Sequence, residues 1–385
     1  MLSGAIVLLL AASAAVQAIG YVSSGLAMPD ALTAAPALLA IILSLPTVLK
    51  HAPVSRWSGF AFWFGVTLLV YLIAVAYSGF TLEGFKTVLQ IALAVGCIFI
   101  GFATGLQERS RRFVDVAIVI TCIALSLFLI AVLLVFPHGD FRPKNIIGSE
   151  LMYLALLLVA ARYDYTGKLT SIRLLAWLLI GAGLVAGHRT VAVLGAAVFI
   201  LDKLLPRFRT AFIHWSVVLA SCGLSVFIVF MYLNIDTLPI FISWNQLAQE
   251  YSGRQVSSGR QLIWPSIWQE IQRSPIFGHG FSLAASQITG QNLSTHNAFF
   301  MILLQVGWVG LIPVLCMLYA LVSKGLSGEY THWRTLFTIT MVIVIINSTF
   351  ETELIQNNFR VSVLLWLALG FIYSRIRFAR VTAIQ

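Results

Sequence analysis

Residues 211–233 read AFIHWSVVLASCGLSVFIVFMYL, a run of 23 residues without Asp, Glu, Lys or Arg. A helix of about 20 apolar residues is long enough to cross the hydrocarbon core of a bilayer. A helix that is apolar on every side requires either a large protein core or lipid around it. The run therefore predicts a membrane-spanning helix.

Further apolar segments of this kind lie before and after residues 211–233, and together they predict about twelve transmembrane helices. The two short spans beginning at 171 and 189 are expected to form a helical pair broken at Gly187-His188-Arg189. The candidate spans are residues 3–24, 31–49, 57–79, 86–105, 112–136, 147–162, 171–187, 189–205, 211–233, 296–322, 333–350 and 359–375.

The composition of the whole chain agrees with a membrane protein. Of its 385 residues, 59% are hydrophobic and only 10% are charged, and the mean hydropathy is +0.94. Soluble proteins carry about 25% charged residues, so we expect a single all-α, polytopic membrane domain over residues 1–385. The 4 Cys residues lie in apolar runs without zinc or redox spacing. The net charge of +10 does not indicate nucleic acid, because the basic residues flank the spans and form no patch.

The distribution of Lys and Arg predicts the orientation. With the N-terminus in the cytoplasm, 16 of the 24 basic residues fall on cytoplasmic segments, as the positive-inside rule requires. Both termini are then cytoplasmic. The first span ends in Val-Gln-Ala, which resembles a signal-peptide cleavage site, but no Lys or Arg precedes it, so we expect it to remain uncleaved.

One long segment outside the spans, residues 234–295, falls on the periplasmic side. Within it, residues 260–273 predict an amphipathic helix, because Trp264, Ile267 and Ile271 share a face at helical spacing. We expect this helix to lie at the membrane interface.

The strongest group of polar residues is His296-Asn297, at the start of a predicted span. Ser294 or Thr295 is expected to cap the helix, which places His296 in its first turn. A neutral imidazole there could serve as a general base. An interfacial histidine without a chemical role fits equally well.

Gly307 and Gly310 follow His296 along the same predicted helix. At 100° per residue they fall near the face that carries His296, so a small-residue groove is expected below the imidazole.

Two arginines are not explained by the orientation rule. Arg189 lies between the two short spans, and Arg260 follows Ser258-Gly259 at the start of the amphipathic segment. The planar guanidinium binds phosphate oxygens bidentately, so both are candidates to hold phosphate. An interfacial anchor is the alternative for Arg189, and a solvated helix face is the alternative for Arg260.

Four further charged residues are predicted near the periplasmic membrane edge: Arg142, Lys144, Glu351 and Arg360. A structural or lipid-facing role is favoured over catalysis for each of them, and Arg142 is kept as a candidate for substrate binding. The sequence shows neither a metal-ligand cluster nor a nucleotide-binding glycine loop.

These motifs resemble the shared core of the bacterial O-antigen ligase and polymerase superfamily. The spacing of His296-Asn297, Gly307 and Gly310 is similar to the histidine motif of the ligases. Arg189 matches an arginine that usually follows a Ser in the family, and here His188 replaces that Ser. The remaining motif residues are Ser258-Gly259-Arg260, Trp264, Pro275, Gly278 and Gly280.

The resemblance implies a GT-C-like glycosyltransferase in the bacterial inner membrane, with its site at the periplasmic face. Such ligases transfer a polysaccharide from undecaprenyl diphosphate to lipid A–core, without metal, nucleotide sugar or other cofactor. Taking the resemblance together with the charged residues at the periplasmic edge, we expect catalytic roles for three residues and substrate binding for five. The catalytic set is His296, Arg189 and Arg260, and the binding set is Asn297, Arg142, Trp264, Gly307 and Gly310.

In the mechanism that the resemblance implies, Arg189 and Arg260 clamp the diphosphate while His296 takes the proton of the acceptor hydroxyl. The hydroxyl then attacks the anomeric carbon in line and inverts it. A groove along Phe300, Leu303 and Gly307 is expected to hold the lipid tail.

Three other functions compete with this hypothesis. An O-antigen or exopolysaccharide polymerase shares the donor and topology but uses another undecaprenyl-linked chain as acceptor. A protein O-glycosyltransferase is generally longer. A transporter or flippase is expected to bury charges at mid-membrane and to show paired halves, and neither feature is evident.

Overall fold

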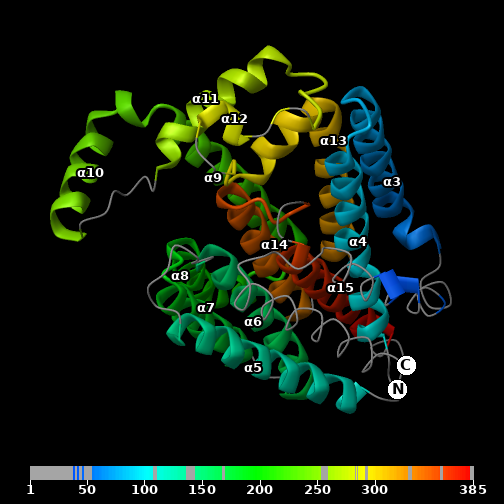
Figure 1. Cartoon of the computed structure of the whole chain (residues 1–385). Helices are drawn as coiled ribbons and strands as arrows, with labels where there is room; N and C mark the ends of the chain where they lie inside the picture. The colour runs from blue at the N-terminus through cyan, green and yellow to red at the C-terminus, as the bar shows by residue number, and fades with distance from the viewer. Residues whose placement is uncertain are drawn as a thin grey trace.

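The computed structural model of the chain describes residues 54–106, 111–135, 144–166, 170–252, 259–281, 285–290, 294–327, 332–355 and 359–381, together with residues 38–39, 41–42, 46 and 283. Within these ranges the regular elements are all helices. The predicted all-α class is confirmed (Figure 1).

Ten helices coincide with predicted spans, and the predicted break between 171–187 and 189–205 is confirmed. The predictions for 3–24 and 31–49 lie outside the described residues, apart from isolated positions of the second. The helices are α3 Val54–Tyr77, α4 Leu82–Gly105, α5 Arg111–Val135, α6 Lys144–Thr166, α7 Thr170–Ala186, α8 Arg189–Leu204, α9 Ala211–Leu233, α13 Ala298–Leu326, α14 His332–Phe350 and α15 Phe359–Val381.

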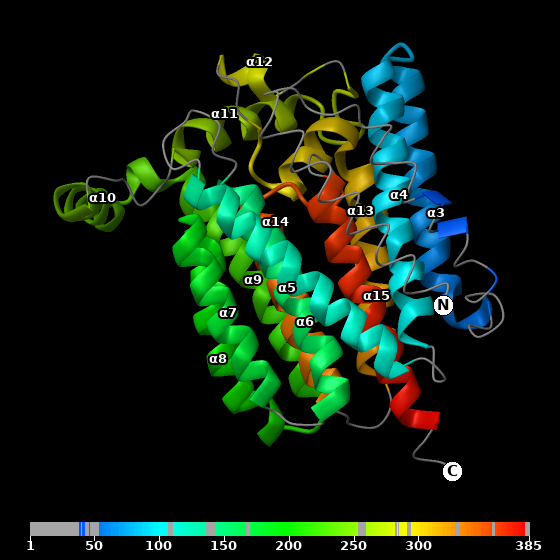
Figure 2. The same cartoon turned by 60° about the horizontal axis from the view of Figure 1, so that its bottom comes forward.

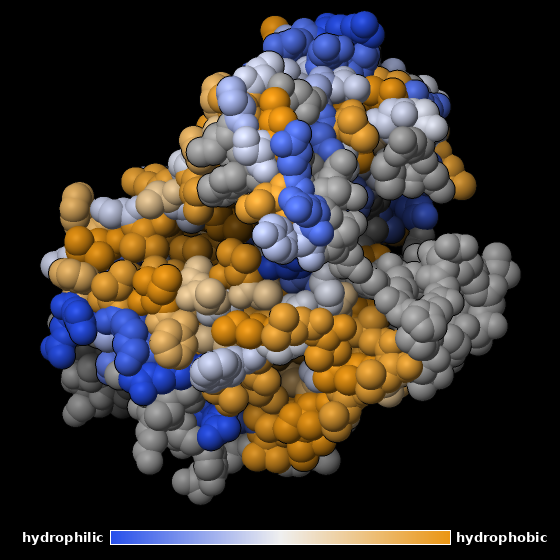
Figure 3. Space-filling model, turned by 90° about the vertical axis from the view of Figure 1, so that its left-hand side faces the viewer, coloured by the Kyte–Doolittle hydropathy of each residue, from blue (hydrophilic) through white to orange (hydrophobic). Residues whose placement is uncertain are grey.

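Seven of the described helices are long and apolar enough to cross a membrane. Helix α9 requires lipid around it, because only 17% of its span is buried inside the protein and Phe212, Val226 and Phe230 are exposed. Hydrophobic residues cover much of the body of the molecule in Figure 3. Apolar surface of this extent is unfavourable in water, so the chain is a multi-pass membrane protein.

Polar contacts show that consecutive spans run in opposite directions. At one end, called the site end below, the start of α6 meets the end of α14 through Asn145 and Glu351. At the opposite end, side chains join the starts of some helices to the ends of others. These contacts are Arg173–Asp202 at 3.1 Å, Arg375–Asp115 at 3.0 Å and Arg334 to the Arg209 carbonyl at 3.3 Å.

Helices α7 and α8 form a tight hairpin. Gly187 has φ 68°, and the N–H groups of Gly187 and His188 donate to the Leu184 and Gly183 carbonyls at 3.2 and 2.8 Å. This closes the C-terminus of α7 with a left-handed glycine. His188 is at once the N-cap of α8, so Arg189 becomes its first residue without any intervening linker.

Helix α13 is broken in its middle, which corrects the prediction of a continuous helix. Gly307 has φ 61° and ψ −160°, a conformation open essentially to glycine alone. The loop of residues 275–280 fills the break: the Trp308 and Val309 N–H groups donate to Pro275 and Ile276, and those of His279 and Gly280 donate to Leu304 and Gln305. The predicted angular relation of Gly307 and Gly310 to His296 is therefore wrong.

The segment 234–295 is itself largely helical where it is described. It contains the short turn η2 Ile235–Thr237 and the helices α10 Pro239–Ser252, α11 Arg260–Arg273 and α12 Ala285–Thr289. Helix α10 extends away from the bundle, whereas α11 and α12 cover its site end (Figures 1 and 2).

Helix α11 is amphipathic as predicted, but its apolar face packs on protein. Trp264, Ile267 and Ile271 are buried, and α11 packs against α9 and α13. The apolar face is therefore covered by protein, because α9 and the kinked α13 offer it partners, and the position of α11 at the membrane interface stays a prediction.

Candidate functional site

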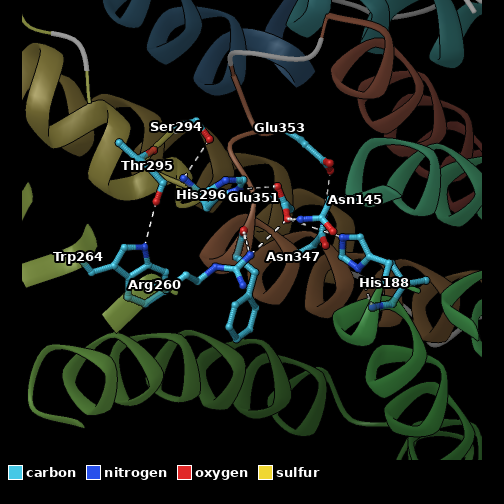
Figure 4. A network of polar contacts seen from close by, with 12 residues as sticks. Asn145, His188, Arg260, Trp264, Ser294, Thr295, His296, Asn347, Glu351 and Glu353 are labelled. Atoms are coloured by element: carbon cyan, nitrogen blue, oxygen red, sulfur yellow. Dashed lines mark hydrogen bonds and ion pairs between the residues drawn. The ribbon is translucent and has the colours of Figure 1, made fainter. Parts of the chain in front are cut away.

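Glu351, the residue after α14, is the centre of a polar network at the site end (Figure 4). Its Oε1 atom accepts a hydrogen bond from Asn145 Nδ2 at 2.8 Å and lies 3.4 Å from Arg260 Nη2 and 3.7 Å from His188 Nε2. Its Oε2 atom lies 3.5 Å from His296 Nδ1. Four segments far apart in sequence thus converge on one carboxylate.

His296 precedes α13, whereas the sequence predicted it in the first turn. Asn297 is the N-cap, and its Oδ1 accepts from the Phe300 N–H at 2.9 Å. His296 has φ 46°, which is uncommon for a non-glycine residue, and its N–H donates to Ser294 Oγ at 3.3 Å. The left-handed backbone turns the imidazole toward Glu351, and its side chain keeps 29% exposure.

Trp264 anchors the segment before α13 that carries His296. Its indole N–H donates to the Thr295 carbonyl at 2.9 Å, and its ring packs on Tyr232 and Phe300 with centroids 4.9 and 5.6 Å apart. Because Trp264 is completely buried, it supports His296 and offers no ring face to a sugar.

Arg260 is the first residue of α11. Its Nη2 donates to the Phe350 carbonyl at 2.9 Å, and its guanidinium lies 5.3 Å from the centre of the Phe350 ring. The N-cap before it is Gly259, at φ 82°, which contributes no capping side chain. Arg260 is therefore anchored at the end of α14, beside the Glu351 carboxylate.

Arg189 is the exposed first residue of α8, directly after His188 of the network. Tyr232, at the end of α9, interacts electrostatically with both Arg260 and Arg189. The two arginines, each the first residue of a helix, thus share one region of the site end. Helix N-termini add positive potential there.

The pKa values of two buried carboxyls near the site are shifted in opposite directions. Burial raises the pKa of Glu351, but contacts with His188 and His296 and the charges of His296 and Arg260 outweigh it and lower this pKa to about 2. Burial, and then repulsion by Glu351, raise the pKa of Glu353 well above its usual value. Glu351 is therefore ionised at neutral pH, whereas the pKa of Glu353 is shifted in the direction that favours its protonated form.

Comparison with known proteins assigns a family to this region. Residues 174–315 match the family model described as O-antigen ligase. The chain carries an O-antigen ligase domain. This finding confirms the predicted membership of the O-antigen ligase superfamily. None of the curated proteins compared with the chain matches it.

The O-antigen ligase domain brings His296, Arg260 and Arg189 to the same end of the bundle, and Glu351 joins them from beyond the matched residues. Asn297, Gly307 and Gly310 are buried: Asn297 caps α13 next to His296, whereas Gly307 lies at the break of that helix and Gly310 follows the break. Phe300 and Leu303 are buried as well. The predicted lipid groove along them is therefore wrong.

Arg142 lies outside the described residues, and so do the side chains of Lys144 and Arg360. Sequence reasoning missed Asn145 and undervalued Glu351 and His188. The available indication was the pair of acids Glu351 and Glu353, which follow directly after a predicted span, where a lipid-facing role would be costly.

The site end combines the elements of a group-transfer site. A carboxylate held against His296 Nδ1 leaves Nε2 for a substrate proton. Arginines at helix N-termini suit an anionic leaving group. Among the residues that the structure describes, no group of three or more His, Cys, Asp or Glu has the arrangement of metal ligands.

Proposed function

We propose that the chain is an O-antigen ligase, which transfers a polysaccharide from undecaprenyl diphosphate to lipid A–core. The observation that carries the proposal is the Glu351–His296 pair at 3.5 Å, with Arg260 on the same carboxylate. The family match supports ligase or polymerase chemistry. The metal-independent, inverting course follows the resemblance to the ligases.

In the proposed reaction, His296 Nε2 takes the proton from the acceptor hydroxyl, and Glu351 stabilises the imidazolium that forms. The hydroxyl oxygen forms a bond to the anomeric carbon from the side opposite the diphosphate. The bond between that carbon and the phosphate oxygen breaks, and its electron pair leaves with the diphosphate. Arg189 and Arg260 stabilise the charge that develops there.

The proposed topology has twelve spans in one membrane domain, both termini in the cytoplasm, and the site end with loop 234–295 in the periplasm. The basic residues Arg173, Arg209 and Arg334 lie at the opposite end, which supports a cytoplasmic position for that end. Both lipid-linked substrates would then reach the site from the outer leaflet of the inner membrane.

The second candidate is an O-antigen or exopolysaccharide polymerase. It is favoured by the same family match and the same site, because the two reactions share the donor and differ in the acceptor. The spacing of His296, Gly307 and Gly310 favours the ligase.

Transfer by the purified protein tests the proposal. The protein in detergent is mixed with an undecaprenyl-diphosphate-linked glycan and lipid A–core, with chelator and without nucleotide, and products are resolved on a gel. We expect glycan on lipid A–core, and loss of at least about 100-fold in rate for His296→Ala and for Arg260→Ala.

Two matched variants serve as controls. Arg273 lies on the same helix as Arg260 but is exposed and paired with Glu270 at 2.7 Å, so Arg273→Ala should retain activity. His332, exposed at the start of α14, is the control histidine. Growth of the lipid-linked glycan without transfer to lipid A–core would identify a polymerase. No product from intact substrates would contradict both functions.

A further inference from the structure

His188 has two partners that the mechanism above does not use. Its side chain is only 2% exposed, and its ring nitrogens face in different directions. Nδ1 accepts the backbone N–H of Val191 at 3.3 Å and so caps α8. Nε2 lies 3.7 Å from Oε1 of Glu351. One buried ring therefore connects the N-terminus of α8 with the carboxylate that faces His296.

The cap determines which tautomer His188 adopts. A backbone N–H can only donate, so Nδ1 must present its lone pair and the ring proton must lie on Nε2. Nε2 then faces Glu351 Oε1 at 3.7 Å, which is longer than a hydrogen bond, and the same oxygen also faces Asn145 and Arg260. Oε1 is thus surrounded by donors from three helices, which leaves Oε2 for His296.

The backbone around His188 is built to hold the ring in place. Helix α6 passes so close that a Cβ on Gly148 would lie 2.6 Å from the His188 Cβ. On the other side, the left-handed Gly187 ends α7 immediately before His188. The side chain has no room to turn away from Glu351 without moving α6 or the hairpin.

We propose that His188 is a positioning residue for glycan transfer. The N–H at Nε2, 3.7 Å from Oε1, orients the Glu351 carboxylate electrostatically, and Glu351 in turn orients the His296 base. Through Nδ1 it fixes the first turn of α8, and with it Arg189. The inference rests on the proposed function. It adds that a single neutral imidazole sets the geometry of the base and of one phosphate-binding arginine together.

Two substitutions separate these roles. In His188→Asn, the amide oxygen replaces Nδ1 and can cap α8, but the side chain is too short to reach Glu351. In His188→Gln, the amide nitrogen replaces Nε2 and can face Glu351, but the cap is lost. Both variants are measured for Tm in detergent and for kcat and donor KM in the transfer assay.

The expected results differ in kind. His188→Asn should keep donor KM and lose about tenfold in kcat, as for other residues that orient a reacting group. His188→Gln should keep kcat within about twofold and raise donor KM, with a lower Tm because α8 loses its side-chain cap. If kcat falls in both variants only as Tm falls, or if His188→Asn is as active as wild type, the proposal is overturned.

A melting experiment tests the coupling of His188 to Glu351 without the transfer assay. If the wild type transfers no glycan, the proposed function is overturned, but the coupling can still be measured. His188→Asn is compared in the wild-type and Glu351→Gln backgrounds. If His188 acts on Glu351, the two changes in Tm are not additive, because the second substitution removes a contact already lost. Additive changes would show that His188 and Glu351 are not coupled, which contradicts the inference.

Discussion

The Oε2 atom of Glu351 lies 3.5 Å from the Nδ1 atom of His296, although 55 residues separate them in the chain. A carboxylate at Nδ1 holds an imidazole in the tautomer whose Nε2 can accept a proton, and it stabilises the cation that results. This relationship, more than the position of His296 alone, makes the histidine a candidate base.

Glu351→Gln should therefore reduce kcat for glycan transfer by about 100-fold or more, with little change in donor KM. The amide keeps the volume but loses the charge that stabilises the imidazolium. Steady-state kinetics with purified protein measure the effect.

Glu353→Gln is the matched control, since the two acids lie two positions apart. The Glu353 carboxyl is buried, its pKa is raised by that burial, and its Oε2 accepts from Asn347 Nδ2 at 2.7 Å. A neutral amide can replace it, so activity should remain within about threefold of wild type. Equal losses for both variants would contradict the assigned charge states and the role of Glu351.

The same carboxylate predicts how stability depends on pH. The pKa of Glu351 falls from 4.5 to about 2 on folding, so the unfolded chain binds this proton more readily. The stabilisation is complete above about pH 4.5 and is lost as the pH falls toward 2. Tm of the wild type should therefore drop toward that of Glu351→Gln between about pH 4.5 and 3. A constant difference in Tm over this range would contradict the prediction.

The spans could be predicted from the sequence because each apolar run has a length set by the bilayer. The break at Gly187-His188-Arg189 was equally local, since a left-handed glycine directly precedes a helix cap. His296, Arg189 and Arg260 were also found, because charged or titratable residues at span ends stand out against apolar neighbours.

The centre of the site could not be predicted, because it depends on contacts between distant segments. Glu351 gains its role only where α6, α8, α11 and the start of α13 meet at the end of α14. Trp264 was expected to contact substrate, but its position is set by packing on Tyr232 and Phe300. Periodicity gives the face of α11 and leaves open whether lipid or protein covers it.

Close packing of α6 on His188 gives a third prediction. Gly148→Ala should displace the His188 ring, because the new Cβ would lie 2.6 Å from the His188 Cβ. We expect a lower Tm and a loss of about tenfold in kcat. Gly181→Ala is the control, since no other atom lies within 4 Å of a Cβ at that helical position. Similar Tm and kcat in the two variants would show that α6 does not constrain His188.

The break in α13 gives the last prediction. A Cβ at Gly307 would lie 2.2 Å from the Ile276 carbonyl oxygen, and the backbone there has φ 61° and ψ −160°. Gly307→Ala must therefore expel the loop 275–280 or straighten the helix. Either change costs more than the roughly 1–3 kcal/mol of backbone strain alone, and the protein should melt well below wild type.

Gly290→Ala separates the two causes of this loss. Gly290 also has a positive φ, 65°, but a Cβ there would meet no atom within 4 Å. It should lower the free energy of unfolding by only the cost of a left-handed backbone at a non-glycine residue, about 1–2 kcal/mol, and should lower Tm correspondingly little. The loop 275–280 follows α11, which carries Arg260, and α13 follows His296. Expelling the loop should therefore also disturb Arg260 and His296. Gly307→Ala should then lose transfer activity at temperatures where the variant remains folded. Full activity in folded Gly307→Ala protein would show that the break in α13 does not position the site.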